Sequence, residues 1–62
     1  MTVHQIIYRL DYVSTRINDC ASDIDQYIEL LDDEKADRLM TITQSIYQSA
    51  EALDTLIGEL EQ

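Results

Sequence analysis

The sequence has almost none of the residues that interrupt regular structure. It contains no proline, and Gly58 is its only glycine. Proline and glycine mark hairpin turns and loops, so their near absence argues against an all-β fold. A single cysteine excludes an intramolecular disulfide. Apolar runs are only two or three residues long, which predicts neither a signal peptide nor a membrane span and favours a soluble, cytoplasmic protein.

Positive charge and catalytic groups are also scarce. Four Lys and Arg residues stand against 13 Asp and Glu residues, for a net charge of -9. Such a surface repels phosphate, which argues against direct nucleic-acid binding. His4 and Cys20 would lie roughly 24 Å apart along one helix, and the paired acids have no histidine to complete a transition-metal site. Because a chain of 62 residues can hardly form an enclosed pocket, we predict a protein that is not an enzyme and has no cofactor or metal.

What the sequence does contain is a heptad pattern in each half. In the first half, apolar residues recur alternately three and four residues apart, which is typical of an α-helix that packs along one seam. They are Val3, Ile6, Leu10, Val13, Ile17, Cys20, Ile24, Tyr27 and Leu31. The second half repeats the spacing with Leu39, Ile42, Ile46, Leu53, Leu56 and Leu60, interrupted only by Ser49. At its seam position, Cys20 is predicted to be a small core residue rather than a reactive thiol.

Polar residues predict where the helices begin. Thr2 and Gln5 have the spacing of a capping box, and Asp32 or Asp33 can cap a second helix. We therefore predict an all-α antiparallel hairpin in a single domain, with helices over about 3–31 and 35–60 and a turn over about 32–34. The alternative is one continuous helix in a coiled coil, with the shifted heptad phase between the halves acting as a stutter.

The predicted hairpin cannot cover all of its own apolar surface. If the seams face each other, Cys20 lies opposite Ile46, and Ile7, Ile28 and Ile57 remain partly exposed beside the seam. A homodimer that forms a four-helix bundle is the simplest way to cover them. The predicted bundle core consists of Ile6, Leu10, Val13, Ile17, Cys20, Ile24, Tyr27, Leu31, Leu39, Ile42, Ile46, Leu53, Leu56 and Leu60.

Residues 29–37, at the junction between the seams, resemble the turn of the Rop (repressor of primer) family of small plasmid proteins. The resemblance implies a dimeric helical hairpin. Members of that family bind paired RNA loops through basic, amide and aromatic groups on the first helix. Here the first helix has only Arg9 and Arg16 as cations, beside several outward acids, so only the fold is carried over.

The negative charge is concentrated around the predicted turn. Residues 19–37 hold -7 of the net -9, whereas residues 1–18 carry +1. In the hairpin, Glu51 and Glu59 should lie beside Arg16 and Arg9 and neutralise them. The acids could simply keep the helices soluble, or they could form a binding face for a basic protein, such as one that binds nucleic acid. The residues of this candidate face are Asp19, Asp23, Asp25, Glu29, Asp32, Asp33 and Asp37.

Aromatic and methionine residues off the seams form two further candidate surfaces. Tyr8 and Tyr12 lie one turn apart on the first helix, and Met40 and Tyr47 lie on the second. Side chains of these types are enriched at the centres of protein interfaces. Alternatively, each tyrosine ring covers the edge of the core with its hydroxyl in water.

These features together predict a small, acidic, non-catalytic protein that regulates or inhibits a protein partner. It would act through helix–helix contacts with a basic or hydrophobic surface. One alternative is a Rop-like RNA-binding dimer that uses Arg9, Arg16 and Tyr12. Another is a secretion chaperone or structural coiled-coil subunit, whose seam is completed by helices of a partner.

Overall fold

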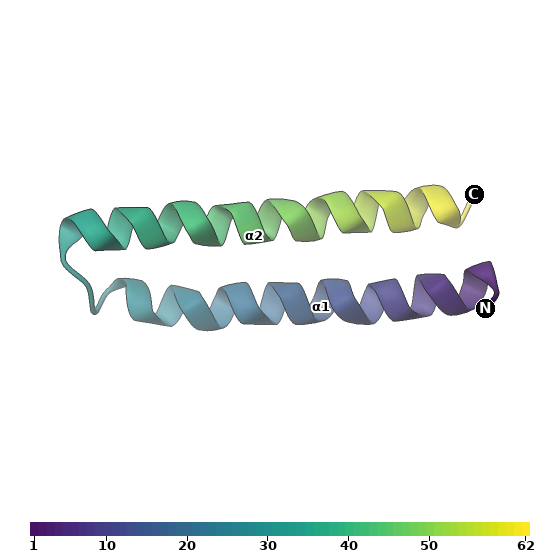
Figure 1. Cartoon of the computed structure of the whole chain (residues 1–62), viewed down its shortest axis with the longest axis horizontal. Helices are drawn as coiled ribbons and strands as arrows, with labels where there is room; N and C mark the ends of the chain where they lie inside the picture. The colour runs from purple at the N-terminus through teal and green to yellow at the C-terminus, as the bar shows by residue number, and fades with distance from the viewer.

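The chain forms two antiparallel α-helices joined by a short turn (Figure 1). The computed structural model describes residues 1–62, with α1 over Val3–Ile28 and α2 over Asp33–Leu60. The hairpin measures 47 × 15 × 12 Å. The predicted all-α hairpin is therefore confirmed, and the continuous helix of about 90 Å is excluded.

The predicted capping box begins α1. The Thr2 N–H donates to Gln5 Oε1 at 2.8 Å, and the Gln5 N–H donates to Thr2 Oγ1 at 3.2 Å. The two side chains thus satisfy two of the backbone N–H groups that a helix start leaves free.

The turn begins earlier than predicted, because α1 ends at Ile28 and residues 29–32 reverse the chain. Asp32 caps α2, because its Oδ1 accepts a hydrogen bond from the Lys35 N–H at 2.9 Å. The backbone of Asp32 is extended, with a ψ of 164°, and is therefore not helical. An N-cap residue cannot continue a preceding helix, so the chain must leave α1 before it. The N–H groups of Leu30 and Leu31 bond to Tyr27 and Ile28 carbonyls three residues back, which tightens the end of α1.

The two helices are rotated relative to the predicted pairing. The covered positions also recur three and four residues apart. In each predicted pair of seam positions, however, the second member is exposed, and the residue that directly follows it in the sequence is covered instead. Along α1 they are Ile7, Leu10, Ser14, Ile17, Ala21, Ile24 and Ile28; along α2 they are Ala36, Leu39, Thr43, Ile46, Ala50, Leu53, Ile57 and Leu60. The expectation that Ile57 is partly exposed is wrong, because only 5% of it is accessible. Ile7 and Ile28 are half-buried.

Small side chains explain this rotation. Four of the five buried residues are small, namely Ser14, Ala21, Thr43 and Ala50. Small residues at a contact let two helix backbones approach closely. The buried small residues therefore lie where the two helices meet.

One hydrogen bond between the helices lies at this contact. Ser14 is 3% exposed, and its Oγ donates to Asp54 Oδ1 at 2.6 Å. The bond satisfies a buried hydroxyl, which would otherwise be costly to desolvate.

The close contact gives a first prediction. Ala50→Leu should lower the free energy of unfolding by about 1–3 kcal/mol, because the larger side chain must separate the helices. Ala52→Leu is the matched control, since Ala52 is exposed on the same helix and its change should stay within about 0.5 kcal/mol. Urea denaturation followed by circular dichroism measures both. Equal effects would contradict the close packing at Ala50.

The cap at Asp32 gives a second prediction. Asp32→Ala should cost about 1 kcal/mol of unfolding free energy, because the Lys35 N–H loses its acceptor. Asp32→Asn removes the same charge but keeps a side-chain oxygen that can accept this hydrogen bond. Thermal denaturation of the two variants separates the cap from the charge. If both lose the same stability, the charge and not the hydrogen bond matters.

Candidate interaction surfaces

The hairpin leaves a row of large apolar side chains uncovered. Only Ala21, Ala50 and Ile57 are buried apolar residues, and no large side chain is fully enclosed. The uncovered side chains that belong to the two heptad seams are 37–59% exposed: Val3, Ile6, Val13, Tyr27 and Leu31 in the first half, and Ile42 and Leu56 in the second. Apart from Val3, all belong to the predicted core. Their predicted pairing inside the hairpin is therefore wrong, because the small residues occupy the helix contact instead.

Most of these side chains share one side of the hairpin. Val3 and Leu31 continue the covered row of α1 beyond its two ends, whereas the other five lie about 80° around from the helix contact, at about 100° per residue. Because α1 and α2 are antiparallel, this rotation turns both rows toward the same side. Near the turn, Leu31 and Ile42 line one shallow hollow of about 220 Å³. We call this side the apolar face; its members are Ile6, Val13, Cys20, Tyr27, Ile42, Ser49 and Leu56.

Cys20 and Ser49 are the two small members of the apolar face. Cys20 is an exposed free thiol, so its predicted place opposite Ile46 is wrong for the hairpin. Ser49 is also exposed, and its Oγ donates to the Ser45 carbonyl on its own helix at 3.0 Å. The polar hydroxyl of Ser49 therefore needs no partner from outside the hairpin.

Six of the seven acidic side chains of the candidate face make no salt bridge within the chain. The seven acids of the candidate face are all exposed. The one salt bridge in the molecule joins Lys35 Nζ to Asp32 Oδ2 at 4.0 Å, between exposed groups, and such a pair contributes little. The predicted neutralisation of Arg9 and Arg16 by Glu59 and Glu51 is wrong, since neither pair forms a salt bridge. No three His, Cys, Asp or Glu side chains lie together in a metal-binding arrangement.

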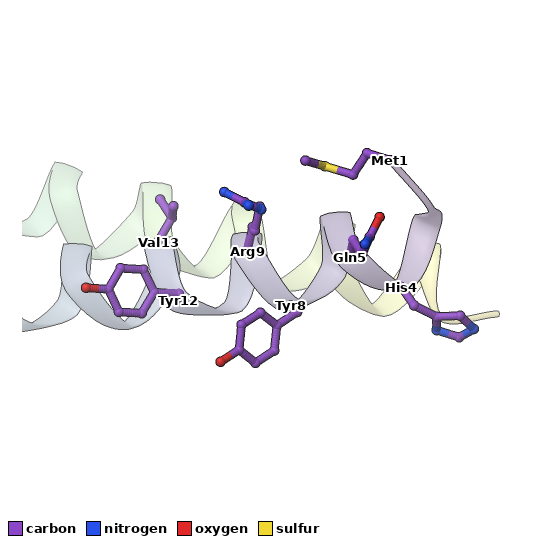
Figure 2. A pocket seen from close by; sticks show the side chains of 7 residues that line it. All are labelled: Met1, His4, Gln5, Tyr8, Arg9, Tyr12 and Val13. Atoms are coloured by element: carbon purple, nitrogen blue, oxygen red, sulfur yellow. The ribbon is translucent and has the colours of Figure 1, made fainter.

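Tyr8 and Tyr12 form an exposed aromatic surface on α1 (Figure 2). They are 79% and 60% exposed, and with Met1, Arg9 and their neighbours they line an open hollow of about 920 Å³. The Arg16 guanidinium carbon lies 5.7 Å from the centre of the Tyr12 ring. Arg16 Nη1 donates to Tyr12 Oη at 3.1 Å, and this hydrogen bond raises the pKa of Arg16. The cation is thus held over the aromatic ring instead of pairing with a carboxylate.

The second candidate pair, Met40 and Tyr47, lies in a different setting. Tyr47 is half-buried, and its hydroxyl donates to Asp25 Oδ2 on the other helix at 3.3 Å. Both residues line a hollow of about 450 Å³ together with Ile28 and Glu29. Desolvation raises the pKa of Tyr47, and the negative charge of Asp25 adds to this shift. Tyr47 therefore has the structural role of a ring that covers the helix contact, whereas Tyr8 and Tyr12 are free.

Comparisons with protein-family models, curated proteins and solved structures find no match to this chain. The likeness to the Rop turn therefore stays a prediction. Neither α1 nor α2 has an apolar stretch of the length needed to cross a bilayer.

The Tyr47–Asp25 contact gives a third prediction, on alkaline stability. Because the folded state raises the pKa of Tyr47, its contribution is fully present below the unfolded pKa of about 10 and is lost as pH rises through the folded pKa. Tyr47→Phe should therefore lose less stability between pH 9 and 11 than the wild type.

Urea denaturation across this pH range measures the difference. Tyr8→Phe is the control, because Tyr8 makes no hydrogen bond across the hairpin, and it should keep the steep alkaline loss. A Tyr47→Phe profile that follows the wild type would contradict the contact.

Proposed function

We propose that this chain is a small, non-catalytic protein that binds another protein in the cytoplasm and thereby regulates or inhibits it. The observation that supports this most directly is the uncompensated negative charge around the turn. Residues 19–37 carry -7, and their one cation, Lys35, makes only a weak exposed contact with Asp32. This charge is available to a partner because no group of the chain neutralises it.

The partner should present a basic surface. Complementary potentials speed encounter and favour the correct orientation of two proteins. The exposed carboxylates of Asp19 and Asp23 lie in the last three turns of α1, and that of Glu29 directly follows the helix. A row of carboxylates on a rigid helix can occupy a surface that otherwise binds phosphates, so a nucleic-acid-binding protein fits the charge. Binding there would block its nucleic-acid site without any catalytic step.

The exposed apolar face supports the proposal that the protein acts as part of a helical assembly. We propose that the working form is a homodimeric four-helix bundle, in which the apolar face is covered and the acids remain outside. A protein whose own helices cover this face, as in a secretion chaperone or a coiled-coil complex, is the second candidate. The exposure of Ile42 and Tyr27, at 55% and 59%, favours both forms over an isolated hairpin.

The Rop-like alternative depends on the cationic part of α1. The Arg16 guanidinium over the Tyr12 ring is an arrangement that could stack against a base. Against it stands the net charge of -9, because each bound phosphate must be neutralised by a cation. A gel shift with structured RNA at low and moderate salt tests this alternative.

Two variants with equal charge change give a fourth prediction. Replacing Asp19, Asp23 and Glu29 by their amides should reduce capture of the protein partner from the native host at least about tenfold at low salt. The control replaces Glu51, Glu59 and Glu61 by glutamine, which removes three charges from the other end of the hairpin and should retain most of the capture. Quantitative mass spectrometry compares the recovered proteins. Equal loss in both variants, or recovery of RNA without a protein partner, would contradict the proposal.

A further inference from the structure

We infer that the apolar face is covered by a second copy of this chain, placed so that the two turns lie at opposite ends of the bundle. The inference deepens the proposed function and rests on its dimeric form, because it names the occupant of the face and the direction in which it lies. Three observations carry it, namely the accessible area of the hairpin, the extent of the apolar face and the distribution of charge along α1.

The accessible surface area of the hairpin is larger than that of a compact protein of the same mass. The hairpin exposes 4986 Å², whereas a compact protein of 7.2 kDa exposes about 4,100 Å². Each hairpin therefore exposes roughly 900 Å² more than a compact protein of its mass. A compact dimer would expose about 6,800 Å², so two hairpins would bury about 3,100 Å² together. That total lies in the range of obligate homodimers.

The extent of the apolar face matches that of the hairpin itself. On α1 the face runs from Ile6 to Tyr27, and on α2 it includes Ile42 and Leu56. A second hairpin of the same 47 Å length can therefore cover it from end to end. Two-fold symmetry requires each copy to offer the same patch, and one continuous apolar face meets this requirement.

Charge decides the direction. If both turns lay at one end, two segments of -7 would be separated only by helix spacings of about 10 Å, close to the screening length of about 8 Å. With opposed turns these segments lie at opposite ends of a 47 Å bundle, where salt screens them almost completely.

A cation of α1 also favours opposed turns. Arg9 follows a residue of the apolar face by three positions, so it lies along the edge of this face in the half of α1 away from the turn. Opposed turns place α1 of one copy antiparallel to α1 of the other. Arg9 then lies beside the acidic half of α1 of the second copy. The same hairpin thus supplies both the cationic and the anionic ends of this contact.

Spin labels near the turn test the direction. The variant Glu34→Cys, made with Cys20→Ser so that it has one thiol, should give an intermolecular distance near the 47 Å length of the hairpin. Ser45→Cys in the same background is the control, because position 45 lies near mid-length and should give a distance below about 25 Å in either arrangement. A distance below about 25 Å for Glu34→Cys would overturn the opposed turns.

Sedimentation separates failure of this inference from failure of the proposed function. The wild type should sediment as a dimer, and Leu56→Glu should weaken the dimer at least about a hundredfold, because a charge would have to be buried. Thr55→Glu, one residue away and off the apolar face, should leave it intact. A folded wild-type monomer would overturn the second copy as occupant. Binding of a basic partner by that monomer would leave the regulatory role standing.

Discussion

The close contact between α1 and α2 is the constraint on which the rest of this structure depends. Ser14, Ala21, Thr43 and Ala50 occupy the centre of that contact and are almost completely buried. Two helices have a limited shared surface, so filling it with small residues displaces larger ones to another side. The hairpin therefore holds its helices together without fully enclosing any large side chain, and its main apolar surface is available for assembly.

The same arrangement separates assembly from recognition. The apolar face lies on one side, while the carboxylates of residues 19–37 and the rings of Tyr8 and Tyr12 project elsewhere. In the proposed dimer, covering the apolar face leaves these polar and aromatic groups accessible. A partner protein can then meet a rigid surface whose side chains need little reordering, which lowers the entropic cost of binding.

Much of the fold follows from local sequence, and the rest does not, for identifiable physical reasons. The Thr2–Gln5 capping box and the Asp32 cap each depend on residues three positions apart, so both could be predicted. The rotation of the helices could not be fixed from spacing alone, because two overlapping stripes share the same three-and-four repeat. The small residues Ala21 and Ala50 were the signal that distinguishes these stripes. The Tyr47–Asp25 contact depends on that rotation. The identity of a protein partner depends on the surface of a second molecule, which the residues of this chain do not specify.

We propose that the hairpin becomes stable by covering its apolar face with a second copy. Thermal unfolding of the wild type over a hundredfold range of protein concentration tests it most directly, because a dimer that unfolds to monomers gains stability by mass action. We predict a midpoint that rises steadily with concentration, together with a native mass twice the 7.2 kDa of the chain. A cooperative midpoint that stays constant over this range, with a native mass of 7.2 kDa, would contradict the claim.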